Sequence, residues 1–150
     1  MSDYAYLVVI DDTPESAVAL RFACRRASEV GARVAMLHVL EPTEFIAFGG
    51  VQETIEAEAR EKAEMMLSDH VERVFAESGM RPTVEIRQGD APQEILAAIA
   101  ADPGIRRLVL AASPTGGPGP LISFFAGEAA SALPCPVIIV PGSLTDDRFA

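Results

Sequence analysis

Residues 111–124, with the sequence AASPTGGPGPLISF, contain the residue types and spacing of a turn that could bind phosphate. A glycine-bearing turn between a parallel strand and a helix N-terminus binds anions, because free backbone N–H groups and the helix dipole point at the ligand. Here three prolines interleave the three glycines. Each proline lacks an N–H donor and has a fixed φ angle. The turn is therefore predicted to lie at the usual position of a phosphate site but to offer few backbone N–H donors to a phosphate.

A second candidate is the acidic pair Asp11-Asp12, which directly follows the first apolar run. Two acids at such a strand end could bind a metal for phosphotransfer, as in a phosphoacceptor receiver. That machinery also needs a third aspartate and a lysine after later strands, and the sequence has neither there. A metal-dependent enzyme therefore stays a third alternative. The alternative that needs no ligand is that Asp11, together with Thr13, caps the first helix.

Other catalytic patterns are missing from the sequence. Lys62 is the only lysine and does not follow a glycine loop, which excludes a Walker-type NTPase. The turn after the first strand reads Asp-Asp-Thr-Pro, so it is not a dinucleotide fingerprint. No histidine is placed to activate Ser113 or Ser123, and His38 and His70 are expected to be packing residues. We expect no catalytic residue and no metal.

Composition limits the partners and the compartment. The 150 residues suit one domain, expected at 1–142, followed by a short polar tail at 143–150 that is expected to be frayed. A net charge of −10 disfavours nucleic acid and anionic membranes. Because no leader or long apolar run is evident, we expect a cytoplasmic protein outside the membrane. Cys24 and Cys135 are expected to be buried, inert thiols.

The apolar periodicity predicts strands alternating with helices. Strands are expected at 6–10, 34–39, 83–86, 107–111 and 137–140, and helices at 14–30, 51–78, after the Asp90 capping box, and at 124–133. This order predicts an α/β fold, an open five-stranded parallel sheet with helices on both faces and 83–86 at an edge. Ligands are then expected beyond the C-terminal strand ends, at 11–13, 39–41 and 113–123.

The connector between the second strand and the long helix is unusually apolar. It includes Phe45, Ile46 and Phe48. These side chains are expected to fold over a strand end or to reach a partner subunit, with a small-molecule lid as the lesser alternative.

Four segments in register carry a family resemblance: residues 8–16 (VVIDDTPES), 37–39 (LHV), 107–110 (RLVL) before the glycine-rich turn, and 133–140 (LPCPVIIV). In this order they resemble the universal stress protein family, over about residues 4–141. The resemblance implies an adenine nucleotide alpha hydrolase-like, Rossmann-like fold. It also implies dimerisation through the last strand, and a family divided into ATP-binding and non-binding branches.

The ATP-binding pattern of that family is G-x-x-G, nine residues, then G-S or G-T. By resemblance, Asp11 corresponds to the aspartate that contacts the nucleoside, and Val39 to the valine whose backbone meets adenine. The loop glycines fall on Ala111 and Pro114, and the final pair falls on Ser123-Phe124. The ATP-binding loop is therefore degenerate in this register.

A shifted register restores G-x-x-G with Gly116 and Gly119, but the final pair is then Ala129-Ala130. Neither register completes the motif. The candidate vestigial nucleotide site comprises Asp11, Val39, Ser113, Gly116, Gly117, Gly119 and Ser123.

The favoured interpretation is a non-catalytic binding and regulatory module of the stress response that does not bind ATP tightly and has no required cofactor. The alternative is an adenine-nucleotide (ATP or AMP) binder with weak hydrolysis or nucleotide-gated signalling. By resemblance the chain is expected to form a homodimer through the last strand, Val137, Ile138, Ile139 and Val140. An apolar strand without lysine suits such pairing at a sheet edge.

Overall fold

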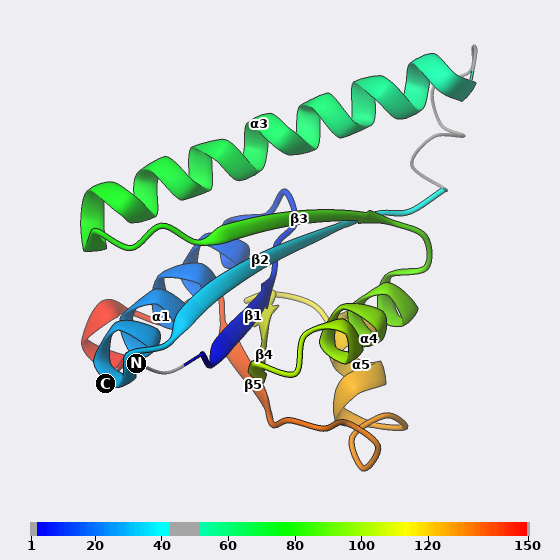
Figure 1. Cartoon of the computed structure of the whole chain (residues 1–150). Helices are drawn as coiled ribbons and strands as arrows, with labels where there is room; N and C mark the ends of the chain where they lie inside the picture. The colour runs from blue at the N-terminus through cyan, green and yellow to red at the C-terminus, as the bar shows by residue number, and fades with distance from the viewer. Residues whose placement is uncertain (1–2, 43–51, 150) are drawn as a thin grey trace.

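Five parallel strands form one sheet in the order β3-β2-β1-β4-β5 in the computed structural model, which describes residues 3–42 and 52–149 (Figure 1). The strands are β1 (Ala5–Val9), β2 (Arg33–Leu40), β3 (Thr83–Gln88), β4 (Ile105–Ala112) and β5 (Val137–Pro141). The predicted parallel sheet is confirmed, and β3 lies at one edge as expected.

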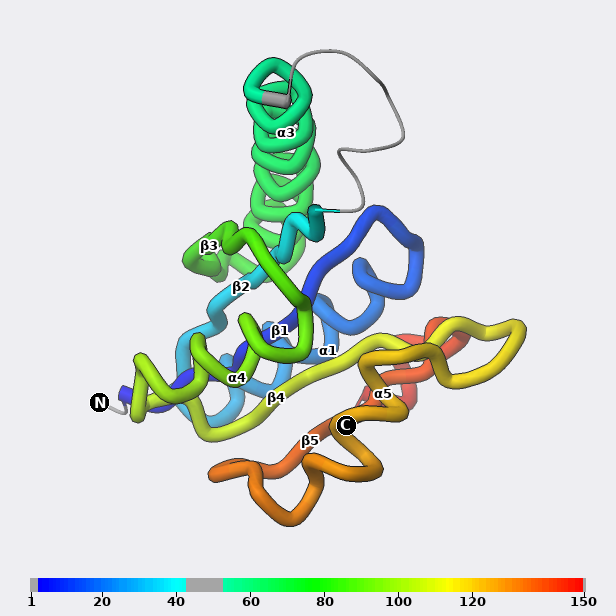
Figure 2. The backbone as a smooth tube through the Cα atoms, turned by 90° about the vertical axis from the view of Figure 1, so that its right-hand side faces the viewer, coloured from blue at the N-terminus to red at the C-terminus, as the bar shows by residue number. Residues whose placement is uncertain are grey.

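Two helices cover each face of the sheet (Figures 1 and 2). The helices are α1 (Pro14–Val30), α3 (Gln52–Ser78), α4 (Ala91–Ala101) and α5 (Gly119–Ala126). One core cluster joins α1 and α3 to the sheet, and a second joins α4 and α5 to the other face. Because side chains alternate along β2, Val39 lies with the second cluster and Leu40 on the α3 side.

Local sequence signals explain where α1 begins and ends. Thr13 is the N-cap with an extended backbone, Pro14 stands in the first turn, and Gly31 closes the helix with φ 72°. That positive φ favours glycine, because it has no Cβ to clash. The Thr13 side chain makes no cap hydrogen bond to the helix. At α4, in contrast, Asp90 accepts a hydrogen bond from the Gln93 N–H at 3.2 Å, as the capping box predicts.

The prediction of a helix at 124–133 is wrong in position, because α5 begins at Gly119. Prolines are well tolerated in the first turn of a helix, where their missing N–H costs nothing. Pro118 and Pro120 take such positions, and Ile122 and Phe125 are buried against the sheet. The prolines therefore start the helix instead of prolonging the loop.

The long helix α3 packs on the sheet through its C-terminal half. The core on this side buries Leu67, Val71 and Val74. Phe75, in contrast, is 41% exposed, and the Arg81 guanidinium lies over its ring, 4.2 Å from the ring centre. The N-terminal half stands away from the body of the molecule (Figure 2). It contributes Ile55 and Ala63 to a separate small cluster with Leu40. The apolar connector residues Phe45, Ile46 and Phe48 lie outside the described residues.

The C-terminal tail is not frayed, contrary to the sequence-based expectation. It forms a short 3-10 helix (Asp146–Arg148), and Phe149 is only 3% exposed. The Phe149 ring contacts Phe22 edge-on at 5.9 Å, and Arg21 forms an ion pair with Asp146. The prediction counted the polar residues of this segment and overlooked its single aromatic anchor. In the described part of the chain, no helix combines the length and apolarity needed to cross a membrane.

Candidate functional site

The turn after β4 is an exposed loop fastened at its base. The Ser113 hydroxyl donates to the Thr115 carbonyl at 2.8 Å, which closes the first part of the loop. Pro114 lies against the end of β5, because a Cβ added to Gly142 would lie 3.1 Å from the Pro114 Cδ and 2.7 Å from the Glu15 Cβ. Gly116 has φ 83°, a conformation that favours glycine. The loop base is therefore packed between β5 and α1.

The helix N-terminus that follows this loop has few donors. The first four N–H positions of an α-helix have no partner inside the helix. In α5 these positions are Pro118, Gly119, Pro120 and Leu121, and the two prolines have no N–H. Only Gly119 and Leu121 can therefore donate to an anion from the first turn.

Ser123 and Phe124 lie inside α5 and not at its start. A backbone N–H at the fifth or later position of a helix is committed to a carbonyl one turn earlier. The Phe124 ring packs edge-on against Phe125, with ring centres 5.0 Å apart. The Ser123-Phe124 pair therefore does not present free N–H groups at a helix start.

Asp11 is held by hydroxyl groups on the turn between β1 and α1. The Thr13 hydroxyl and the Ser16 hydroxyl both donate to its Oδ1, the latter at 2.7 Å, and the Asp11 N–H donates to the Ser16 Oγ at 3.0 Å. Ser16 is 1% exposed, so this network is partly shielded from water. Asp11 thus organises the start of α1 with Thr13, although not through a standard N-cap bond. Its carboxylate orientation is fixed.

The strand order brings the predicted segments to one edge of the sheet. In the sheet, β1 lies between β2 and β4. The C-terminal ends of these three adjacent strands therefore bring together Asp11 after β1, Val39 near the end of β2, and the glycine loop after β4. Val39 is 8% exposed and packs toward α4, on the face opposite to α3. The topology thus assembles the candidate residues, whereas the loop chemistry limits what they can bind.

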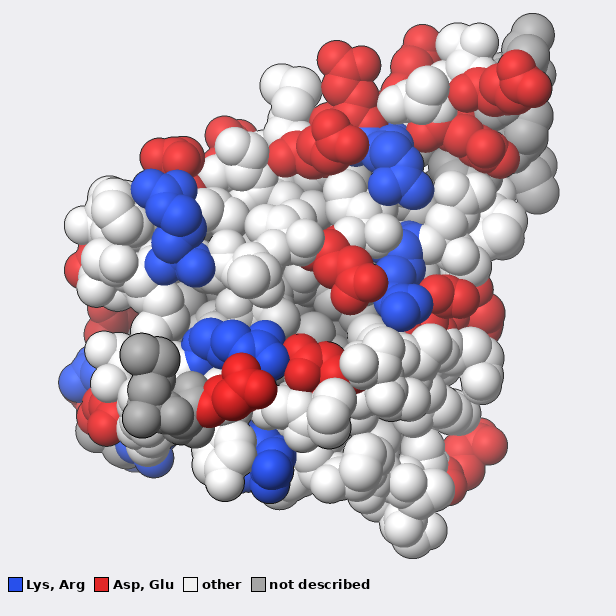
Figure 3. Space-filling model, viewed as in Figure 1, with Lys and Arg blue, Asp and Glu red and all other residues white. Residues whose placement is uncertain are grey.

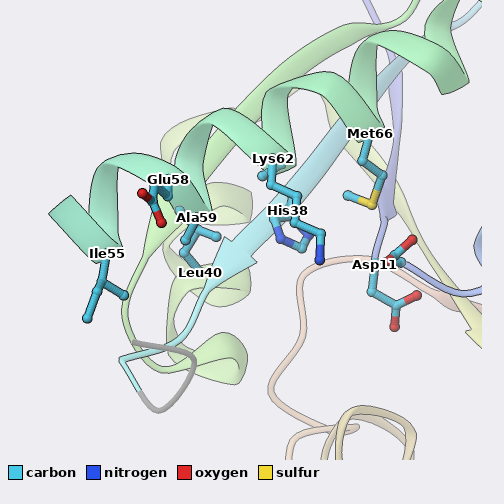
Figure 4. Close-up of a pocket in the computed structure, with 10 residues that line it drawn as sticks. Asp11, His38, Leu40, Ile55, Glu58, Ala59, Lys62 and Met66 are labelled. Carbon is cyan, nitrogen blue, oxygen red and sulfur yellow. The ribbon is translucent and has the colours of Figure 1, made fainter. Parts of the chain in front are cut away.

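A cavity of about 620 Å³ lies on the α3 side of the sheet (Figure 4). Of the candidate vestigial nucleotide site, Asp11 is the residue that lines it, and Asp12 of the acidic pair lines it as well. The other walls come from the end of β2 and the N-terminal half of α3, including His38 and Lys62. The sequence predicted His38 as a packing residue and gave Lys62 no role in a site, so this cavity was missed. Among the described residues, no group of three or more His, Cys, Asp or Glu side chains is placed to hold a metal ion.

The sequence model of the universal stress protein family matches residues 6–141. The chain belongs to the universal stress protein family. Among curated protein sequences, no relative matches it.

Solved structures of universal stress proteins share the fold at low sequence identity. The universal stress protein UspA from Lactobacillus plantarum is 22% identical, with a TM-score of 0.72 over 93% of this chain and 99% of that one. A family member from Burkholderia pseudomallei is 20% identical, with a TM-score of 0.67 over 91% of this chain and 95% of that one. The universal stress protein from Archaeoglobus fulgidus in complex with dAMP is 18% identical, with a TM-score of 0.60 over 93% of this chain and 99% of that one.

In this universal stress protein, the residues present do not fit a triphosphate by the pattern of the ATP-binding branch. Ala111 belongs to β4 and Pro114 has no N–H donor. Ser123 lies within α5, so its N–H is not free. Of the glycines that remain, Gly116 stands on the exposed loop and Gly119 is the first residue of α5, and both have positive φ.

Proposed function

We propose that this universal stress protein is a non-catalytic binding and regulatory module of the stress response that does not hold ATP tightly. The observation that carries the proposal is the early start of α5. It places Pro118 and Pro120 among the four N-terminal positions that would otherwise donate to a phosphate. Glycine-rich turns bind phosphate through such donors.

The magnitude of the missing contacts favours weak binding. A charge-assisted hydrogen bond contributes roughly 1.5–3 kcal/mol, and each 1.4 kcal/mol is tenfold in affinity. The loss of two or three such bonds to a phosphate tail therefore weakens ATP binding by several orders of magnitude. Nucleoside contacts are affected less, because Asp11 and Val39 remain at the ends of adjacent strands.

A second candidate function is the binding of an adenine nucleotide with a short phosphate tail. Two relatives support it: the Archaeoglobus fulgidus protein described above, and a universal stress protein whose structure is in complex with cAMP. The latter is 18% identical, with a TM-score of 0.60 over 95% of this chain and 100% of that one. The amides of Gly116, Gly117 and Gly119 are the donors that this chain offers to one phosphate.

Calorimetry with ATP, ADP and AMP, with and without magnesium, tests both candidates. We expect no binding of ATP at micromolar concentration. Micromolar ATP binding would overturn the proposal. If AMP binds, Asp11→Asn is expected to weaken it and the neighbouring Asp12→Asn to leave it unchanged. A gain of ATP affinity in Pro114→Gly would trace the weakness of the native loop to its missing donor.

We further propose that two copies pair through β5. Val137–Pro141 forms an edge of the sheet, and Ile139 on it is 42% exposed. An unpaired apolar edge strand is a template for pairing with another chain. Light scattering at low concentration is expected to give twice the chain mass of 15.9 kDa.

The opposite edge of the sheet offers a matched control. Ile139→Lys is expected to give a monomer, whereas Val84→Lys, at an equally exposed site on β3, is expected to leave the dimer intact. A native chain that stays at 15.9 kDa would refute the pairing.

A further inference from the structure

The cavity beside α3 has one apolar end. Its apolar walls are Leu40, Ile55, Ala59, Ala63 and Met66. Leu40, Ile55 and Ala63 are each less than 9% exposed. A volume of about 620 Å³ lies in the range of small-molecule sites, which is roughly 300–1,000 Å³.

Small side chains on α3 account for the space. Residues four apart on a helix lie on the same face, and Ile55, Ala59 and Ala63 follow this spacing toward the end of β2. Farther along the same helix, the larger Leu67 and Val71 fill the core. Because Ala59 and Ala63 are small, they leave room between the helix and the sheet.

The other end of the cavity is rich in acceptors. Asp11 and Asp12, which follow β1, line this end together with His38 of β2, and Figure 4 shows His38 beneath α3 on the side of Asp11. The His38 Nδ1 is 2.6 Å from the Ile10 carbonyl oxygen. A carbonyl can only accept, so Nδ1 carries the proton, and in the neutral ring Nε2 is an acceptor. Glu58 adds a third carboxylate near the apolar end.

Among the described residues that line the cavity, Lys62 is the single cation. Its side chain extends from α3 toward Asp11 (Figure 4). It forms no ion pair within the part of the chain that the structure describes. The described lining therefore carries three carboxylates, of Asp11, Asp12 and Glu58, and one ammonium group, which is an excess of negative charge. Acidic side chains also gather over the N-terminal half of α3 outside the cavity (Figure 3).

We propose that this cavity binds an organic cation, namely an apolar body that carries an ammonium group. The body would lie against Leu40, Ile55 and Met66, and the ammonium group would donate to Asp12, to the Asp11 carboxylate and to the His38 Nε2. Buried apolar surface supplies affinity, while the few polar groups at one end fix the orientation. The excess of acceptors selects a cation over a neutral or anionic molecule of the same shape.

This inference does not rest on the proposed function. The glycine loop follows β4, and Val39 points to the α4 face, whereas the cavity lies between β2 and α3 on the other face. Asp11 is the one residue common to both. The nucleotide experiments can therefore fail without affecting this site, and the reverse also holds.

The chain has no tryptophan, which permits a direct optical test. Tryptamine is titrated with the full-length protein, and its indole anisotropy is followed at wavelengths that do not excite tyrosine. The neutral alcohol tryptophol and the anion indolepropionate share the ring and serve as charge controls. We expect tryptamine to bind at least tenfold more tightly than either. Equal binding of the three probes, tighter binding of indolepropionate, or no binding of tryptamine would overturn the proposal.

Matched variants locate the site. Ala59→Leu fills the cavity and is expected to weaken tryptamine binding at least tenfold, while Ala57→Leu, an exposed position on the same helix, is expected to have no effect. Asp12→Asn is expected to weaken binding about three- to tenfold beyond Glu61→Gln, which makes the same change in net charge at an exposed position that does not line the cavity.

Lys62→Met provides a test in the opposite direction. It removes the competing ammonium and keeps an apolar stem, so tryptamine is expected to bind about threefold or more tightly. Circular dichroism confirms that each variant is folded. A loss of tryptamine affinity in Ala59→Leu no larger than in Ala57→Leu, or weaker tryptamine binding in Lys62→Met, would exclude this site.

Discussion

Truncation of one aromatic ring near the C-terminus tests whether the tail is part of the folded domain. In Phe149→Ala the lost side chain is 3% exposed in the native protein. Burial of a phenylalanine contributes about 1.5–3 kcal/mol. The edge-on contact with Phe22 adds about 0.5–1.5 kcal/mol, and Arg21, 5.5 Å from the ring centre, adds about 0.5–1 kcal/mol.

Part of this loss is recovered. A released tail regains backbone entropy, and because residues 145–148 are exposed, its release leaves no closed cavity behind. We therefore expect the free energy of unfolding to fall by about 1–2 kcal/mol, below the roughly 3–5 kcal/mol typical of Phe→Ala in a closed core.

Urea unfolding followed by circular dichroism measures this change, with an unchanged slope of free energy against urea. Arg148→Ala, at an exposed residue one position earlier, is the control and is expected to cost little. A loss in Phe149→Ala below about 0.3 kcal/mol, or no larger than the control, would mean that the docked tail is not a stabilising element and would refute the reasoning.

Three further predictions follow from buried and paired groups. The Arg33 guanidinium, 2.8 Å from Asp102, holds the pKa of that carboxyl below its usual range. The ion pair therefore stabilises the fold above the ordinary carboxyl pKa of about 3.9, and acid titration of unfolding is expected to show its loss as the pH falls below that value. Ser16→Ala leaves the Asp11 N–H without its 3.0 Å acceptor and is expected to cost about 1–3 kcal/mol in thermal unfolding. Burial raises the pKa of Cys24 to about 12, so native protein at neutral pH is expected to resist iodoacetamide at this thiol.

Each of these has a control. Asp147→Asn, at an exposed acid, is expected to keep the acid-dependent loss that Asp102→Asn removes. Ser68→Ala, at an exposed site on α3, is expected to be nearly neutral beside Ser16→Ala. Unfolding in urea is expected to restore labelling of Cys24, and rapid labelling of the native thiol would contradict its burial.

Local signals carried most of the fold. Pro14 and Gly31 bound α1 as predicted, because a fixed φ and a positive φ are local requirements that few residues meet. The short β-branched runs became strands because of another local preference, that of β-branched side chains for strands. Pro118 and Pro120 were ambiguous, since proline suits both a loop and a first helical turn. The burial of Ile122 and Phe125 decided between them, and burial depends on the rest of the fold.

The site was less predictable than the fold. Alternating strands and helices predict a parallel sheet whose C-terminal strand ends share one edge, so a site at that edge was foreseeable, although the order of the strands was not predicted. The cavity beside α3 was not, because it depends on how far a helix stands from a sheet. Ala59 and Ala63 are ordinary helix formers, and only their position opposite the end of β2 gives them a role.

The position of Lys62 also makes it a natural place for a reporter group. Because the chain has no other lysine, Lys62 on the wall of the α3 cavity is the one side chain that an amine-reactive dye can label besides the N-terminal amine. After excess reagent is removed, the fluorescence of a dye on Lys62 can report occupancy of the α3 cavity, without engineering a new attachment point into the protein.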